Sequence, residues 1–191
     1  FTSGSSSGAS LAACALINTE DDLWRVFPAN QLVRFHKQTG VLSGYGNWPL
    51  GITRNFHHAA YDSFTKTIWL IPGKGAPIVS FDTATTLMVK YEAWPSTFVP
   101  GQGNRPISGG IVHMQHLWLA PYAGNEVVRV ALSSETTSGD PIGTMTGFSN
   151  WPTWPVPFSS TSGIFSGIVY DGSQDAWLIQ HHCNMVVRVT L

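Results

Sequence analysis

The chain has 191 residues, and its 10 basic and 11 acidic side chains leave a formal net charge of −1. Only 11% of the residues are charged, whereas a soluble domain usually carries about 25%. Nucleic acid is not an expected partner, because phosphate backbones are bound through clustered basic side chains and the sequence has no basic run. Membrane insertion is not expected either, because no stretch approaches the roughly 20 apolar residues that a spanning helix needs.

The N-terminal residues are small and polar. After Phe1 the sequence consists of Ser, Thr and Gly as far as Gly8. We expect residues 1–10 to be a flexible lead-in or a closing strand, and residues 11–191 to form a single domain. The sequence has neither an initiating Met nor a signal peptide, so we expect a processed chain or a segment of one.

The sequence contains four repeats, and a pair of small residues lies near the start of each one. Each pair of small residues lies in or beside a short apolar run, and the pairs are Ala12-Ala13, Ala59-Ala60, Gly109-Gly110 and Ser166-Gly167. Glycine and other small residues in a strand are typical of places where backbones approach closely. We therefore predict that these segments are inner strands crowded around a central axis.

A tryptophan flanked by apolar residues follows each small pair. These residues are spaced by 45, 49 and 59 positions and are Trp24, Trp69, Trp118 and Trp177. A second apolar run has its third residue 10 or 11 positions after each Trp, in Leu32–Phe35, Ile78–Phe81, Val127–Val130 and Val186–Val189. Loops with Pro, Gly or Asn separate the two runs in the first three repeats, which is typical of hairpins.

A Trp-Pro pair closes the first three repeats, as Trp48-Pro49, Trp94-Pro95 and Trp151-Pro152. We expect these tryptophans to pack between neighbouring repeats. Each repeat predicts up to four antiparallel strands, named A, B, C and D from the axis outward. A helix over Leu11–Val26 is the rival interpretation, and we discount it because the same register recurs elsewhere with Gly and β-branched residues.

These repeats predict an all-β fold, a β-propeller of four blades. A sheet of 40 to 50 residues whose Trp-bearing strand is apolar on both faces must be covered on both sides. Radial packing of such sheets buries both faces of each one against its neighbours.

The blade pattern resembles known propeller families. The segments 60–85 and 167–189, with Ala60-Tyr61-Asp62 and Val169-Tyr170-Asp171-Gly172 ahead of their Trp, are similar to blades of NHL and virginiamycin-B-lyase-like propellers. Those families usually have six or seven blades. A ring of four blades closed by a disulfide between the first and last resembles hemopexin-like domains instead, although their characteristic repeat sequence is absent. The resemblance implies the fold and carries over no catalytic residue.

The last repeat lacks its strand D. The sequence ends at Leu191, only 14 residues beyond Trp177, whereas the first two repeats need 24 and 25 residues to reach their closing Trp. The edge Val186–Thr190 would then offer unpaired backbone groups. The lead-in could supply the missing strand, a partner chain could donate it and so build a homo-oligomer or filament, or the chain could be cut from a longer propeller.

Two cysteines lie near opposite ends of the sequence. Cys14 and Cys183 fit a ring-closing disulfide in an oxidising compartment, and they fit two buried thiols equally well. The sequence leaves this choice open.

Four histidines are candidate ligand-binding residues. His57 and His58 begin the second strand A, and His181 and His182 lie in the fourth B–C loop, so the topology predicts both pairs on the face formed by the D–A and B–C loops. Imidazoles there could bind a transition metal or act as acid and base. Their spacing matches no metal motif, so we predict no metal, no cofactor and no catalytic residue.

Two aromatic residues are further candidates for ligand contact. Trp154 falls outside the repeat, and Tyr122 lies in a B–C loop, so both could be exposed platforms for a glycan or a protein. For Trp154, packing onto a neighbouring blade is an equal alternative.

Recurrent charged residues predict structural roles. Arg34, Arg129 and Arg188 occupy equivalent positions on strand C, and we expect each to pair with a carboxylate or carbonyl of the adjacent blade. Turn positions hold Asp62, Asp82 and Asp171, which we expect to form turns.

Together these features favour a non-enzymatic, extracellular propeller used for binding or self-assembly, on a cell or virion surface. The first alternative is a lectin or small-molecule-binding propeller with its site on the D–A and B–C loop face. A lyase-like or hydrolase-like enzyme is the second alternative, although the sequence has no GxSxG elbow, phosphate-binding Gly loop or CxxC pair.

Overall fold

The computed structural model describes residues 16–27, 31–52, 56–73, 77–100, 106–133, 139–151, 163–181 and 185–191. The lead-in at residues 1–10 lies outside these ranges, as do Cys14, Cys183, Trp154 and His182. The disulfide and the roles of these residues therefore stay predictions.

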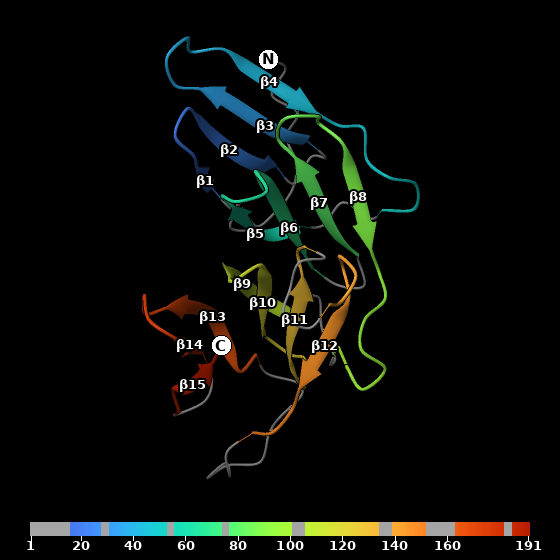
Figure 1. Cartoon of the computed structure of the whole chain (residues 1–191), viewed down its shortest axis with the longest axis vertical. Helices are drawn as coiled ribbons and strands as arrows, with labels where there is room; N and C mark the ends of the chain where they lie inside the picture. Colours follow the sequence, from blue (N-terminus) through green and yellow to red (C-terminus); the bar gives the residue numbers. More distant parts are fainter. Residues whose placement is uncertain are drawn as a thin grey trace, which may run out of the picture.

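Four antiparallel sheets follow one another along the chain, and each is a meander (Figure 1). Blade 1 contains β1 (Leu16–Asn18), β2 (Asp22–Phe27), β3 (Gln31–His36) and β4 (Leu42–Tyr45). Blade 2 contains β5 (Phe56–Asp62), β6 (Thr67–Pro72), β7 (Ile78–Asp82) and β8 (Met88–Tyr91). Blade 3 contains β9 (Ile107–His113), β10 (His116–Pro121), β11 (Val127–Ala131) and β12 (Met145–Phe148). Blade 4 contains β13 (Phe165–Tyr170), β14 (Asp175–Gln180) and β15 (Val187–Thr190).

The predicted all-β propeller of four repeats, with an incomplete last blade, is confirmed. The rival helix is wrong for the described part of residues 11–26, because Leu16–Asn18 forms β1 and β2 begins at Asp22. Each predicted Trp occupies the second strand of its blade and pairs with the predicted third strand, so that Trp24 lies opposite Arg34 and Trp69 opposite Ser80.

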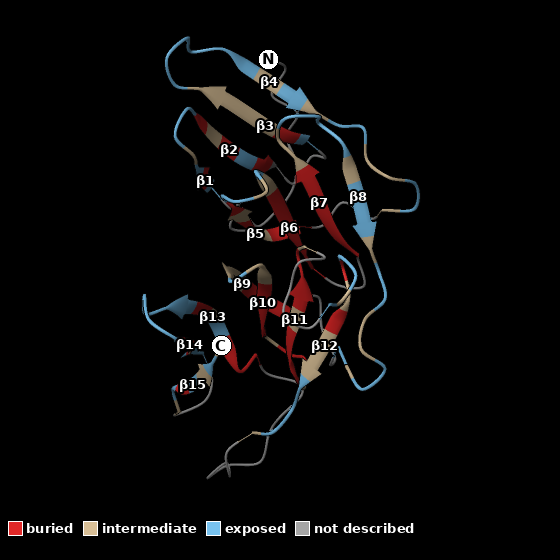
Figure 2. Ribbon diagram, viewed as in Figure 1, coloured by how far each residue is buried: buried red, intermediate tan, exposed pale blue. Residues whose placement is uncertain are grey.

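The hydrophobic core lies between the blades and is divided into three clusters. The middle strands alternate their side chains between two clusters: Ile68 and Leu70 of β6 pack towards blade 1, whereas Trp69 and Ile71 pack towards blade 3. In Figure 2, β6, β7, β10 and β11 consist largely of buried residues, whereas the outer strands β4 and β8 carry exposed residues. Apolar residues on both faces of the Trp-bearing strand are therefore buried by two neighbours, as the radial arrangement requires.

The blades form an open arc. Contacts between inner strands run from β1 to β5, from β5 to β9 and from β9 to β13. Among the described strands, no contact of similar extent joins β13 back to β1. In Figure 1, blade 1 lies at one end of the arc and blade 4 at the other. The expected closure between the first and last blades, as in a hemopexin-like ring, is therefore not seen in the described part of the chain.

The Trp-Pro tryptophans pack between blades, as predicted. Trp48, which follows blade 1, stacks on Phe56 at the start of blade 2, with ring centroids 5.4 Å apart. Trp151, which follows blade 3, stacks on Phe165 at the start of blade 4 at 5.8 Å. Each indole therefore anchors the connection from one blade to the next.

The aspartates at recurrent turns form those turns, as predicted. Asp62 accepts a hydrogen bond from the Phe64 backbone N–H at 3.0 Å, and Asp82 accepts one from the Ala84 N–H at 2.8 Å. Asp171 accepts a bond of 2.8 Å from the Ser173 N–H. These side chains replace backbone acceptors and fix the chain reversals between strands.

The strand C arginines pair inside their own blades, so the predicted partner on the adjacent blade is wrong. Arg34 Nε lies 2.7 Å from Oδ1 of Asp22, and Arg188 Nη1 lies 3.7 Å from Oδ2 of Asp175. Both aspartates precede the Trp by two residues, and residues two apart on a strand share a face. The aspartate and the arginine therefore lie diagonally opposite each other on one face of the sheet, within reach of an ion pair.

Candidate functional site

A polar pocket of about 490 Å³ lies between the turn ends of blades 1 and 2. It is formed by the β1–β2 turn of blade 1 and by the β5–β6 and β7–β8 turns of blade 2. Its lining residues are Asn18, Thr19, Glu20, Asp21, Asp22, Trp24, Tyr61, Ser63, Lys66 and Thr83. Because strands alternate in direction, this face is opposite the one that carries the D–A and B–C loops.

Hydrogen bonds hold the blade 1 wall of the pocket in place. The Thr19 hydroxyl donates to the Asp22 carbonyl at 3.1 Å, and the Asp22 N–H donates back to that hydroxyl at 3.2 Å. Lys37 Nζ donates to the Glu20 carbonyl at 2.8 Å and also to that of Thr19. The turn carrying Glu20 and Asp21 is therefore fixed by its own residues and by the residue that follows strand β3.

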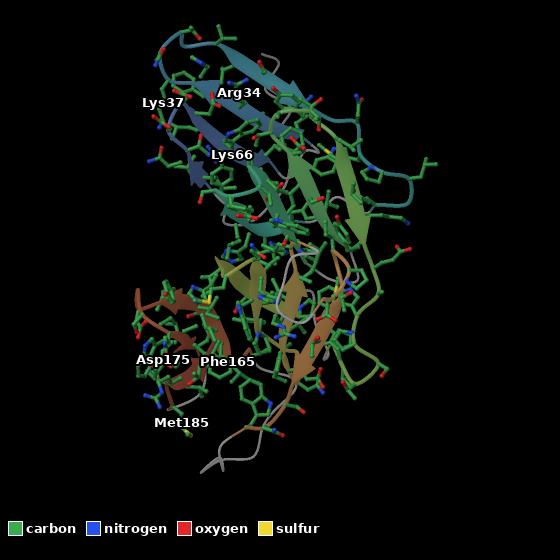
Figure 3. The ribbon with its side chains drawn as sticks, in the orientation of Figure 1. Arg34, Lys37, Lys66, Phe165, Asp175 and Met185 are labelled. Carbon is green, nitrogen blue, oxygen red and sulfur yellow. The ribbon has the colours of Figure 1, made fainter. Side chains whose placement is uncertain are left out.

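The blade 2 wall is fixed in the same way. The Thr83 hydroxyl donates to the Lys66 carbonyl at 2.7 Å and the Thr83 N–H donates to the same oxygen at 3.1 Å. Asp62 accepts the Thr65 hydroxyl at 2.6 Å. In Figure 3, Lys37 and Lys66 both lie on the side of the first two sheets where these turns are found. The pocket is therefore bounded by two turns that hydrogen bonds within the protein hold in place.

The two walls carry opposite charge. Glu20 and Asp21 are carboxylates on blade 1, and Lys66 is an exposed ammonium on blade 2. Within the described ranges these three groups belong to no ion pair, whereas Asp22 is occupied by Arg34. The pocket therefore offers acceptors on one side and a donor on the other.

Tyr61 supplies an aromatic side chain with a neutral hydroxyl. Burial raises the pKa of the Tyr61 phenol, and the negative charges of Asp62 and Asp22 raise it further. A phenol is protonated at neutral pH even at its ordinary pKa of about 10, so the Tyr61 hydroxyl can donate a hydrogen bond to a ligand in the pocket. Trp24 also lines the pocket, although its side chain is almost wholly buried.

The opposite face brings together two of the predicted residues, Tyr122 and His181. Their rings lie 5.4 Å apart, between the B–C loops of blades 3 and 4. Backbone hydrogen bonds link these loops in series, since the Ile164 N–H donates to the Tyr122 carbonyl at 2.7 Å and the His181 N–H donates to the Ile164 carbonyl at 2.8 Å. Neighbouring loops are thus tied to one another on this face.

His57 and His58 are adjacent in β5, but their side chains differ in burial. His57 is buried, and His58 is partly exposed. A Cβ built on Gly109 would lie 3.7 Å from Nδ1 of His58, so the inner strand of blade 3 leaves room for the imidazole. The pairing of β5 with β6 shifts register between Phe56 and His58, so His57 is the extra residue of a bulge at the start of this strand.

No group of three or more His, Cys, Asp or Glu side chains suited to holding a metal ion occurs in the described parts of the chain. The prediction of no metal stays a prediction, because His182 and Cys183 are outside those parts.

Sequence reasoning missed the pocket. It placed the ligand face at the D–A and B–C loops and treated the β1–β2 and β5–β6 turns only as connections. Asp21 and Lys66 occupy the same repeat position, three residues before Trp24 and Trp69, but the repeat does not indicate that these two turns face one another. Only the packing of blade 1 on blade 2 brings them together. One available signal was three consecutive acidic residues, Glu20-Asp21-Asp22, in a chain with few charges.

In the part of the chain that the structure describes, no helix is long and apolar enough to cross a membrane. No protein-family model matches the sequence, and no curated protein matches it either.

Several solved structures share the fold. A structural genomics protein of unknown function from Bacteroides thetaiotaomicron aligns with a TM-score of 0.59 and 12% identity, over 93% of this chain and 46% of that one. An auxiliary nutrient binding protein from Bacteroides ovatus aligns with a TM-score of 0.58 and 16% identity, over 96% and 46%. The extracellular domain of a protein described as a one-component system from B. thetaiotaomicron aligns with a TM-score of 0.55 and 16% identity, over 92% and 23%.

At these sequence identities the similarity shows a shared fold and does not indicate a shared function. The chain spans less than half the length of each of these three structures. The likeness therefore establishes an architecture shared with longer chains, and it places no functional residue in this one.

Proposed function

We propose that this chain is a non-enzymatic, extracellular binding module of the propeller type, and that it binds a small carbohydrate in the pocket between blades 1 and 2. The observation that carries the proposal is the set of polar groups around that pocket. Carboxylates, hydroxyls, an amide and an ammonium surround a space of about 490 Å³, which is large enough for a small ligand.

The chemistry of the lining matches a sugar. Each sugar hydroxyl both donates and accepts a hydrogen bond, so a saccharide needs acceptors such as Glu20 and Asp21 together with donors such as Lys66 and Tyr61. The ring of Tyr61 offers an apolar surface to the C–H groups of a pyranose. Because both walls are already fixed by hydrogen bonds, binding would require little ordering of the protein.

The structural neighbours support a binding role in general terms. Two of them are auxiliary nutrient binding proteins, and two others are extracellular domains of Bacteroides proteins. Their fold is the same, and a nutrient binding protein on this fold is compatible with a saccharide ligand here. The low charge and the aromatic loops of this chain also suit an extracellular setting.

A glycan array followed by calorimetric titration of the best ligand tests this proposal. Replacing Glu20 by Gln removes one negative charge from the pocket, whereas replacing Lys66 by Met or Tyr61 by Phe removes one hydrogen-bond donor. Each variant is expected to weaken saccharide binding by about tenfold, since one hydrogen bond to a charged or buried group is lost or, in Glu20→Gln, becomes a weaker bond to a neutral amide. Lys90→Met is the matched control, because Lys90 pairs with Glu92 at 3.1 Å on β8 and does not line the pocket.

Two results would contradict the proposal. If no saccharide bound, or if a saccharide bound equally well to all three pocket variants, the pocket would not be its site. If free amino acids bound instead, the opposite charges of the two walls would be recognising a zwitterion, and the carbohydrate assignment would be replaced.

The D–A and B–C loop face is the second candidate site. The ring contact between Tyr122 and His181 is the observation that favours it, and His58 lies on the same face. Loss of glycan binding in Tyr122→Ala with unchanged binding in Tyr61→Phe would move the site to this face. Trp154 and His182 stay candidates there by sequence position.

A further inference from the structure

Phe64 is 72% exposed, which is more than any other Phe, Tyr or Trp that the structure describes. It lies in the β5–β6 turn between Ser63 and Lys66, which both line the pocket between blades 1 and 2, but Phe64 does not line that pocket. It also belongs to none of the three hydrophobic clusters. An exposed aromatic ring therefore lies beside the proposed binding site.

The backbone that carries Phe64 is held without help from its ring. Asp62 accepts hydrogen bonds from the Phe64 N–H at 3.0 Å and from the Thr65 hydroxyl at 2.6 Å. The Lys66 carbonyl accepts the two bonds from Thr83 that fix the blade 2 wall of the pocket. The turn therefore fixes where the ring lies relative to the pocket, and the exposed ring is available for contact with a ligand.

The corresponding turns of blades 3 and 4 combine the same two kinds of side chain. Met114, which is 73% exposed, lies next to Gln115 in the β9–β10 turn. Tyr170, which is 37% exposed, ends β13 and is followed in the same turn by Gln174. Gln115 and Gln174 share the repeat position of Lys66, three residues before the repeat tryptophan. Each of these turns therefore carries an exposed apolar surface and a polar side chain.

One repeated hydrogen bond holds these turns in the same way in every blade. The residue that follows the third strand donates its backbone N–H to the carbonyl three residues before the tryptophan, at 2.8 to 3.1 Å. The pairs are Lys37 with Asp21, Thr83 with Lys66, Leu132 with Gln115 and Leu191 with Gln174. Because strands alternate in direction and the inner strands contact one another in blade order, the turns form a row on one face of the arc (Figure 1).

The polar side chain of the blade 3 turn is also oriented. The Ser133 hydroxyl donates to Oε1 of Gln115 at 2.9 Å, so the amide nitrogen of Gln115 remains as a donor. Lys66 is a donor at the equivalent position of blade 2. Two successive turns therefore offer a hydrogen-bond donor close to an exposed apolar side chain, with Lys66 near Phe64 and Gln115 beside Met114.

A glycan fits this row better than a protein or a membrane does. Phe64 and Met114 belong to different turns, and each is flanked by polar residues, whereas protein and membrane interfaces use contiguous apolar patches. An anionic membrane also attracts clustered basic side chains, and the sequence has no basic run. A pyranose presents C–H groups on its faces and hydroxyls around its edge, so it contacts an apolar side chain and a polar one together.

We propose that the ligand is a linear oligosaccharide, whose first sugar unit occupies the pocket between blades 1 and 2 and whose next units extend over Phe64 and Met114 towards blade 3. This inference rests on the proposed function, because it extends the same site. The second unit lies on the ring of Phe64 and the third on the side chain of Met114, where it accepts a hydrogen bond from Gln115.

A series of linear oligomers tests the proposal. Glucose, mannose, xylose and N-acetylglucosamine, each as the single sugar and as linear oligomers of two to six units, are titrated by calorimetry into the whole 191-residue chain. In the series that binds best, the affinity is expected to rise at least about tenfold between one unit and three, because Phe64 and Met114 add contacts beyond the pocket. Equal affinity for one unit and three would overturn this inference and leave the pocket proposal standing, whereas no binding by any sugar would overturn both.

Phe64→Ala tests whether the ring is the second contact. The variant is expected to bind the three-unit oligomer about tenfold more weakly and to bind the single sugar as the parent chain does. Leu50→Ala is the matched control, because Leu50 is 92% exposed and lies in the connection between blades 1 and 2, on the opposite face. Urea unfolding should give both variants the stability of the parent chain, since Phe64 packs into no hydrophobic cluster of the described residues. A loss of affinity that is equal for both lengths, or no loss, would contradict the proposal.

Met114→Asn tests the direction in which the glycan extends. Asn readily adopts the left-handed φ of 44° found at this position, so the substitution keeps the turn and removes the apolar side chain. It is expected to weaken binding of the three-unit oligomer about threefold and to leave the single sugar unaffected. Phe64→Tyr keeps an aromatic ring and should retain the affinity of the parent chain. If Met114→Asn changed the affinity for no oligomer, the glycan would leave the pocket in another direction, and the course proposed here would be wrong.

Discussion

Arg34 lies directly opposite Trp24 in the pairing of β3 with β2, and its Cζ is 5.7 Å from the centre of the indole ring. The same guanidinium holds the buried carboxylate of Asp22 at 2.7 Å. Blade 3 repeats the stacking, with Arg129 Cζ 5.9 Å from the ring of Trp118. In blade 1, one arginine therefore covers the repeat tryptophan and neutralises the aspartate beside it.

Arg34→Met is expected to destabilise the fold by about 1–3 kcal/mol, because it removes the cation over Trp24 and leaves Asp22 buried without its partner. Arg188→Met makes the comparison in blade 4, where the arginine side chain is 60% exposed and 3.7 Å from Asp175. That variant should lose less than about 1 kcal/mol, because exposed ion pairs contribute little. Urea unfolding measures both, and equal losses would contradict this account.

Gly110→Ala is expected to destabilise the protein by about 1–3 kcal/mol through overpacking. A Cβ there would lie 2.8 Å from Cδ1 of Ile71 and 3.0 Å from the Trp118 carbonyl. Gly167 is the second residue of the corresponding small pair in blade 4, but a Cβ added to it would have nothing within 4 Å, so Gly167→Ala should be neutral or slightly stabilising. Thermal unfolding of the two variants tests whether the inner strands are crowded between blades 2 and 3, and the prediction fails if Gly110→Ala is neutral.

Met114→Asn is expected to stabilise the fold by about 1 kcal/mol. Met114 and Gln115 form the two-residue turn between β9 and β10 with φ values of 44° and 60°, a left-handed conformation that Asn adopts more readily than Met. The Met114 side chain is exposed, so its replacement removes no packing. Leu50→Asn, at another exposed apolar position, is the control and should change stability by less than about 0.5 kcal/mol in the same denaturant titration.

Acid should weaken the β7–β8 turn through Asp82. Hydrogen bonds from the backbone N–H groups of Thr85 and Ala84 lower the pKa of the Asp82 carboxyl. Because the folded pKa is below the unfolded value of about 3.9, this stabilisation is present above that pH and is lost as the pH falls through the folded pKa.

Asp82→Asn keeps an acceptor for the turn and cannot titrate. Its free energy of unfolding should therefore fall less steeply than that of the parent chain below about pH 4. Chemical denaturation at several pH values between about 2 and 6 measures the two slopes. Identical slopes would mean that Asp82 contributes nothing to the acid sensitivity.

Most of the strand pattern could be predicted from the sequence, because each blade repeats the same local requirements. Apolar runs around Trp69 and Trp118 had to be buried on both faces, and the turn aspartates fixed where the strands reversed. The Asp-x-Trp spacing, seen in Asp22-Leu23-Trp24 and in Asp175-Ala176-Trp177, could also have predicted the arginine partners. Residues two apart on a strand share a face, so each of these aspartates lies within reach of the arginine opposite its Trp.

The curvature of the arc and the pocket could not be predicted in this way. The angle between blades depends on how side chains such as Trp24 and Phe81, 5.4 Å apart, meet across two sheets, and no repeat period encodes that angle. The pocket depends on turns of different blades. Asp21 and Lys66 both lie three residues before a repeat tryptophan, but that spacing does not indicate that the two turns face one another. Only the packed structure brings them to one place.

The division of the core between blades has a consequence for local opening. Side chains of β6 and β10 enter two hydrophobic clusters each, whereas those of β2 and β14 enter only one. The detachment of an end blade disrupts one hydrophobic cluster, whereas the detachment of blade 2 or blade 3 disrupts two hydrophobic clusters. Amide protons of β6 and β10 should therefore exchange with deuterium most slowly, with faster exchange in the blades at both ends of the arc.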